Sequence, residues 1–120
     1  MLLFAIINVG CSPKGTYVKV TNYRYIATGA PTLKAEVIKT WKFSDREVVE
    51  TILKSLSDIK AANVYYDIAP PPYVAQVYKN GTLSNEYSIW LGDTRGIVWL
   101  NNTWYHMSEK ANEELKLLWE

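Results

Sequence analysis

The sequence contains one cysteine and one histidine among its 120 residues. An intramolecular disulfide is therefore excluded, and so is a zinc site built from several Cys or His ligands. The Gly-x-Ser-x-Gly, His-Glu-x-x-His, P-loop and Gly-x-Gly-x-x-Gly patterns are absent as well, although many hydrolases, metalloproteases and nucleotide-binding proteins carry one of them. We therefore expect no catalytic residue, no metal and no cofactor, and we interpret His106 as a hydrogen-bonded strand residue at the surface.

An excess of one charge is also missing, because 13 basic and 12 acidic residues leave a net charge of +1. Nucleic-acid binding requires a dense positive surface that neutralises phosphates, so we expect no nucleic-acid partner. Hydrophobic residues make up 48% of the chain, which together with the low net charge excludes disorder. Aromatic residues are plentiful: five Trp, nine Tyr and two Phe. The length fits one domain, which we place at residues 16–120.

No hydrophobic run approaches the roughly 20 residues that a transmembrane helix needs. The first eleven residues are largely apolar and end at Cys11, and Ser-Pro-Lys-Gly follows. We interpret residues 1–15 as a truncated lipoprotein signal and tether, although no Lys or Arg precedes the apolar run. The lipid would then be attached to Cys11 and would hold the protein at the cell membrane, on the extracytoplasmic side. In the alternative, residues 2–9 form a buried strand and Cys11 is an inert buried thiol.

The rest of the chain alternates between strand-like and helix-like patterns without a repeat. Residues 60–72 read as a connection that ends in three prolines, and a bulge is expected near Asn22. Strands are predicted at 16–26, 34–42, 73–79, 85–91, 97–100 and 103–107, and helices at about 45–58 and after Ser108, which is expected to cap the second helix. Tight turns are predicted at Asn80-Gly81 and at Asn101-Asn102. The order ββαββββα predicts an α+β fold, in which an antiparallel sheet of about five to six strands carries both helices on one face.

The start of the first helix has the strongest local pattern. Ser44 and Glu47 have the spacing of a capping box, in which each side chain bonds a backbone amide of the first turn. Capping also accounts for the acidic residues of this turn without a catalytic role. Further along, Glu50 and Lys54 are spaced to form an ion pair on the solvent side.

Over roughly residues 16–119, the sequence resembles the YhfM-like domain of small lipoproteins from Gram-positive bacteria. The segments that carry the resemblance are Phe43-Ser44-Asp45, Pro72 to Tyr78, Asn80-Gly81, Glu86 to Leu91, Gly96 and Trp104 to Ser108. The resemblance implies an α+β fold and a lipoprotein context. It implies no active site, since these segments are structural in character.

The aromatic residues supply the candidate binding surface. Within the strand 85–91, Trp90 alternates with Tyr87 and Ile89, so it points to the opposite side of the sheet. If the helices cover one face, Trp90 lies on the other. Depending on the register, Tyr73 or Tyr78, Trp99 and one of Trp104 or Tyr105 are expected to share this face with Trp90. The candidate binding surface is therefore taken as Trp90, Trp99, Trp104, Tyr73 and Tyr78.

Two functions are consistent with these features. The first is a non-catalytic domain of a cell-envelope lipoprotein that binds another envelope protein, because Trp and Tyr are frequent anchors of interfaces. The alternative is a small ligand-binding domain that stacks a cell-wall glycan on its aromatic face. Ordinary cross-strand pairing, which stabilises an exposed sheet, would also explain the aromatic residues.

Overall fold

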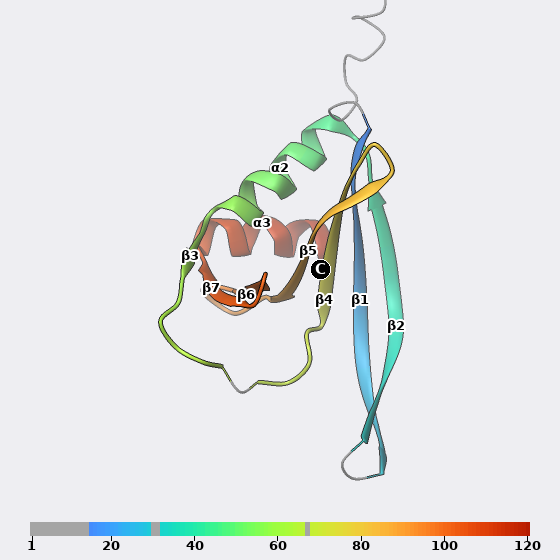
Figure 1. The fold of residues 1–120 in the computed structure, drawn as a ribbon, viewed down its shortest axis with the longest axis vertical. Coiled ribbons are helices and arrows are strands. Elements are labelled where there is room, and N and C mark those ends of the chain that lie inside the picture. Colours follow the sequence, from blue (N-terminus) through green and yellow to red (C-terminus); the bar gives the residue numbers. More distant parts are fainter. Residues whose placement is uncertain (1–14, 30–31, 67) are drawn as a thin grey trace, which may run out of the picture.

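The computed structural model describes residues 15–29, 32–66 and 68–120. They form a seven-stranded antiparallel sheet with helices α2 (Arg46–Ser57) and α3 (Glu109–Trp119) on one side of it (Figure 1). The strand order across the sheet is β2-β1-β4-β5-β6-β7-β3. The strands are β1 (Thr16–Gly29), β2 (Thr32–Phe43), β3 (Ile59–Ala61), β4 (Tyr73–Lys79), β5 (Thr82–Trp90), β6 (Ile97–Leu100) and β7 (Thr103–Met107). The predicted α+β class and its helix placement are confirmed.

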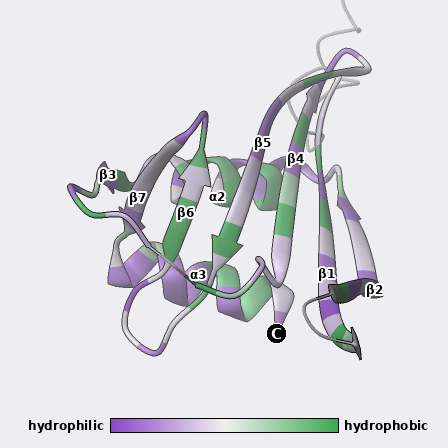
Figure 2. Ribbon diagram, turned by 60° about the horizontal axis from the view of Figure 1, so that its bottom comes forward, coloured by the Kyte–Doolittle hydropathy of each residue, from purple (hydrophilic) through white to green (hydrophobic). Residues whose placement is uncertain are grey.

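The core lies between the sheet and the two helices (Figure 2). Alternate residues of the central strands point into it, since successive side chains of a strand face opposite sides. Both helices contribute an apolar stripe at helical spacing, as the sequence pattern predicted. The fully buried side chains include Val18, Val20, Val49, Ile52, Leu56, Ile89, Val98, Met107 and Leu115.

Two tight turns set the register of the hairpins. Asn80 and Gly81 have φ values of 53° and 80°, and Asn101 and Asn102 have 49° and 61°. Left-handed values at both central residues define a type I′ turn, whose twist matches that of the flanking strands. Asn and Gly tolerate this conformation best, so both predicted turns have a clear physical cause.

Helix α2 begins one residue later than the capping-box pattern indicated. Asp45 is the N-cap, and its Oδ2 accepts a hydrogen bond of 3.2 Å from the backbone N–H of Val48. The prediction that Ser44 caps the helix is therefore wrong, because a carboxylate one position further along takes the same role. The expected partner of Glu50 is also wrong, since its Oε2 lies 3.7 Å from Nε of Arg46, one turn earlier.

The first two residues of the connection predicted at 60–72 are the end of an additional strand, β3. β3 pairs with β7 at the edge of the sheet, with Lys60 opposite His106. The backbone N–H of Ala62 continues the pairing with a 2.9 Å bond to the carbonyl of Trp104. Three residues are too few to show a periodic pattern, and the sequence analysis therefore missed this strand. The sheet has seven strands where about five to six were expected.

The hairpin of β1 and β2 extends well beyond the rest of the sheet (Figure 1). β4 pairs with β1 only from Thr16 to Asn22, whereas the pairing of β1 with β2 continues to Gly29. At the expected bulge, the partners of Asn22 and Tyr23 jump from Lys39 to Val37. We call residues 23–29 and 32–38 the outer ribbon.

Candidate functional site

Three tryptophans gather on the side of the sheet that faces away from the helices. Trp99 and Trp104 are cross-strand neighbours on β6 and β7, and their ring centroids are 4.7 Å apart. Trp90 on β5 reaches the same place, with its ring 5.5 Å from that of Trp104. The structure thus brings together three of the five residues predicted for the aromatic face.

The segment between β3 and β4 packs onto these rings. Tyr66 and Tyr65 meet Trp104 edge to face, at 5.3 Å and 6.5 Å between centroids. The Trp90 indole N–H donates a 2.8 Å bond to the carbonyl of Ala69, and Nε1 of Trp104 is buried without a hydrogen-bond partner in the described part of the chain. The rings therefore pack mainly against one another, in the tilted geometry that aromatic side chains prefer. They do not form the open platform that the sequence pattern suggested.

His106 borders the aromatic cluster, which we define as Trp90, Trp99, Trp104, Tyr65 and Tyr66. Its Nε2 is hydrogen-bonded to the hydroxyl of Tyr66, and the two rings are 5.7 Å apart. The expectation of a hydrogen-bonded strand histidine is confirmed. Among the described residues, no group of three or more His, Cys, Asp or Glu is placed to hold a metal ion.

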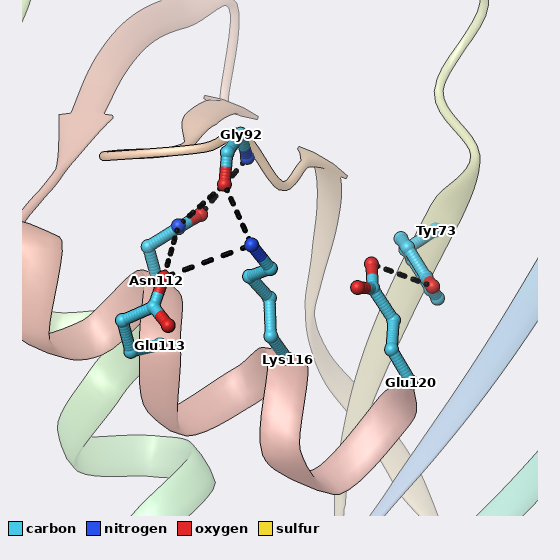
Figure 3. A network of polar contacts seen from close by, with 6 residues as sticks. All are labelled: Tyr73, Gly92, Asn112, Glu113, Lys116 and Glu120. Atoms are coloured by element: carbon cyan, nitrogen blue, oxygen red, sulfur yellow. Dashed lines mark hydrogen bonds and ion pairs between the residues drawn. The ribbon is translucent and has the colours of Figure 1, made fainter.

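Tyr73 lies on the wrong side of the sheet for the predicted surface. Its side chain is only 7% exposed and packs against Trp119, at 5.4 Å between rings, within the core. The hydroxyl donates a 3.2 Å bond to Oε2 of Glu120 (Figure 3). Burial, the charge of Glu120 and this bond together raise the pKa of Tyr73 to about 12. Of the alternatives Tyr73 and Tyr78, the structure excludes Tyr73, because it alternates in step with the buried residues Ala75 and Val77.

Tyr78 does lie on the side away from the helices, but in a separate contact. Its ring stacks on that of Tyr17 at 4.9 Å with an angle of 10° between the planes. The ammonium group of Lys42 lies 4.4 Å from the centre of the Tyr17 ring, in a cation–π arrangement. Tyr78 therefore takes part in cross-strand packing between β4 and the start of β1, apart from the three tryptophans.

Asn112 ties helix α3 to the loop that follows β5 (Figure 3). Its side chain is fully buried and forms two hydrogen bonds with one residue, Gly92. The Gly92 N–H donates to Oδ1 at 3.0 Å, and Nδ2 donates to the Gly92 carbonyl at 2.8 Å. The ammonium group of Lys116 adds a bond of 3.3 Å to the same carbonyl. Both polar atoms of the buried Asn112 side chain therefore have hydrogen-bond partners, which explains this buried polar residue by a structural role.

The outer ribbon has an apolar side, which the sequence analysis did not identify. Alternation and register place six residues on the side that carries the aromatic cluster: Tyr23, Tyr25, Ala27, Leu33, Ala35 and Val37. Leu33 is 49% exposed and Val37 56% exposed. The opposite side is mostly polar and includes the ion pair of Arg24 with Glu36.

The triproline segment supports the base of this ribbon. The carbonyl of Pro71 accepts a 2.7 Å bond from the Tyr25 hydroxyl, and the carbonyl of Pro72 accepts one of 2.7 Å from the Tyr23 N–H. These bonds act as a short extension of β4 along β1. Beyond these two bonds, no helix or other strand of the described structure packs against the projecting end of the ribbon (Figure 1).

A model of one protein family, described as YhfM protein, matches residues 30–120. The chain belongs to the YhfM family. No curated protein and no solved structure matches the chain. The match covers β2 through α3, so the aromatic cluster and Asn112 belong to the part of the chain that the family model describes.

The features of this YhfM-family chain that bear on membrane attachment lie outside the described residues. Cys11 is among them, so the expected lipid attachment has no structural account. Within the described ranges, no helix is long and apolar enough to cross a membrane.

A shallow hollow opens on the same side of the sheet as the aromatic cluster, at its Trp99 end. It measures about 440 Å3 and lies between β5 and the turn that joins β6 to β7. The residues around it are Leu83, Ser84, Asn85, Glu86, Ser88, Trp99, Asn101 and Asn102. Trp99 is the member of the aromatic cluster that lines this hollow.

Proposed function

We propose that this YhfM-family chain is a non-catalytic protein-interaction domain of a bacterial cell-envelope lipoprotein. The observation that carries the proposal is the apolar side of the outer ribbon. Its aliphatic residues Leu33 and Val37 are about half exposed, and the ribbon projects beyond the core that would otherwise bury them. Contiguous apolar surface outside a core is typical of a protein contact site.

The two sides of the ribbon indicate how a partner binds. β2 is an edge strand, and an unprotected edge can pair with a strand of another chain. Here the edge carries Lys34, Lys39 and Lys42, and Ile38 forms a bulge. Lysines and bulges both oppose edge-to-edge pairing. We therefore expect the partner, an envelope protein with its own apolar patch, to cover the side chains of the ribbon rather than extend the sheet.

The position of the ribbon is compatible with attachment through a lipid on Cys11. In this proposal residues 1–15 are a lipoprotein signal and tether, and Cys11 holds the domain on the extracytoplasmic side of the cell membrane. Gly15 adjoins the turn at Asn80, whose N–H donates a 2.8 Å bond to the Gly15 carbonyl. The free end of the ribbon lies at the opposite end of β1, roughly 45 Å away for a strand of 14 residues. A tether at Cys11 would therefore leave the apolar ribbon facing away from the membrane.

Site-specific photo-cross-linking in cells tests this proposal. A photoreactive residue at Val37 samples the apolar side, and one at Glu36 samples the opposite side of the same strand. We expect a defined cross-linked protein from position 37 and not from position 36. Equal yields at the two positions, or none at either, would contradict a specific contact on the apolar side.

The alternative function, binding of a glycan on the aromatic face, is supported by a smaller part of the surface than expected. Trp104 is enclosed by Tyr66 and Tyr65, and Tyr73 is in the core. Trp99 keeps a hollow beside it. In this alternative, the glycan would stack on Trp99 in the hollow beside it.

A further inference from the structure

We propose that the hollow beside Trp99 is a binding site for a neutral saccharide, formed where the indole meets polar side chains of β5 and of the turn at Asn101–Asn102. The site is independent of the outer ribbon, because it lies on β5, β6 and β7. Its volume of about 440 Å3 is within the range of small-molecule sites.

The hollow arises from a difference in strand length. β5 begins at Thr82, but β6 pairs with it only from Ser88 to Trp90. The earlier residues of β5 therefore extend past the end of β6, and the turn at Asn101–Asn102 closes the space on one side. The result is a step in the sheet, with Trp99 at its edge.

The chemistry of the hollow matches a sugar ring, which has an apolar C–H face and a rim of hydroxyl groups. The indole of Trp99 offers the flat apolar contact. Ser84, Asn101 and Asn102 offer hydroxyl and amide groups that can both donate and accept hydrogen bonds with hydroxyls. The lining is mostly polar, with Trp99 as its one aromatic residue, which suits a hydroxyl-rich ligand better than an apolar one.

The charge of the hollow argues against an anionic ligand. None of its lining residues is Lys, Arg or His, and Glu86 is the single acidic one. The Oε2 atom of Glu86 accepts a 2.7 Å bond from Nε2 of Gln76 on β4. This bond fixes the carboxylate on the sheet, where it can accept a bond from a ligand hydroxyl. A phosphate or carboxylate would meet this negative charge without a compensating cation.

Two features hold the site in place before a ligand arrives. The Trp99 ring rests against Trp104 at 4.7 Å, so its orientation is restrained from the side of the aromatic cluster. Asn101 and Asn102 have fixed left-handed backbones in a type I′ turn. Binding therefore orders few additional side chains, which keeps its entropic cost small.

Two-dimensional NMR of the 15N-labelled protein tests the proposal through the indole N–H signal of Trp99. The probes are two neutral disaccharides, N,N′-diacetylchitobiose and maltose, with glucose 6-phosphate as an anionic comparison. We expect at least one neutral disaccharide to shift the Trp99 signal saturably in the millimolar range, and glucose 6-phosphate to bind more weakly. Trp99→Ala, followed through backbone signals of the turn, should raise the Kd about tenfold or more because the stacking contact is lost.

A second pair of variants separates binding from folding. Asn102→Gly keeps the left-handed turn and removes one amide, so the Kd should rise about threefold to tenfold. Leu117→Ala changes an 83% exposed side chain of α3, on the other side of the sheet, and should leave the Kd unchanged. The proposal is overturned if neither disaccharide gives a saturable shift, if the phosphate binds more tightly than both, or if Asn102→Gly and Trp99→Ala bind as the natural protein does.

Discussion

Replacing the fully buried Asn112 by alanine tests how helix α3 is held to the loop after β5. The substitution removes two hydrogen bonds to Gly92, of 2.8 Å and 3.0 Å. Each is worth about 1 kcal/mol net, and the Gly92 N–H left without its partner adds a penalty, for a total of about 2–4 kcal/mol. The midpoint of thermal unfolding should fall by about 10 °C for a domain of this size. Urea unfolding followed by tryptophan fluorescence gives the free energy directly.

Asn112→Asp is the matched comparison, because it keeps the shape and one acceptor but introduces a buried charge. Full burial and the nearby carboxylate of Glu113 would raise the pKa of the new carboxyl, and the ammonium group of Lys116 on the Gly92 carbonyl would lower it. Because the site is fully buried and Lys116 is already paired with Glu113, we expect burial to prevail and the folded-state pKa to lie above the unfolded value of about 4. The penalty would then apply above that value and disappear as the pH falls below it. We expect Asn112→Asp to be less stable than Asn112→Ala near pH 7 and to regain stability relative to it near pH 4. A loss below about 0.5 kcal/mol for both variants would refute the role of Asn112.

Three further predictions follow from single contacts. Asp45→Ala should lower the free energy of unfolding by about 1 kcal/mol through loss of the helix cap, while Ser44→Ala should change it by less than about 0.5 kcal/mol, as urea titration would show. Burial and the neighbouring Glu120 raise the pKa of Tyr73 to about 12, so the contribution of the neutral Tyr73 side chain to stability is complete below about pH 10 and is lost as the pH rises toward 12. Tyr73→Phe should therefore weaken the alkaline loss of stability, measured by unfolding at stepped pH, and an unchanged profile would contradict this. Cys11→Ser should move the protein from the membrane fraction to the soluble fraction of cells that produce it, and continued membrane attachment would exclude the lipid anchor.

Local patterns predicted most of the fold correctly. The Asn-Gly and Asn-Asn turns placed the hairpins, because few residues adopt left-handed backbone at low cost. Ser108 was correctly predicted to cap α3, and its Oγ accepts a 3.1 Å bond from the N–H of Ala111. These signals depend on residues close in sequence. Alternation likewise placed Trp90 on the side away from the helices.

Features that depend on long-range packing were predicted less well. Tyr73 could have been placed in the core, because it shares its parity with the apolar residues Ala75 and Val77. The contacts of Tyr65 and Tyr66 with Trp104 could not have been predicted, since the segment that carries them has no regular pattern. The outer ribbon was missed for another reason: a strand sequence does not reveal that its neighbour in the sheet ends earlier.

The size of the native complex tests the ribbon proposal most directly. Membranes from cells that produce the natural protein would be solubilised in mild detergent, and the complex would be sized by native electrophoresis. We predict a species larger than the monomer that is lost in Val37→Lys and kept in Lys34→Glu, which alters the opposite side of the same strand. Both substitutions should leave the unfolding midpoint nearly unchanged, because these side chains are exposed. A complex that survives Val37→Lys, or a natural protein that migrates only as a monomer, would contradict the account.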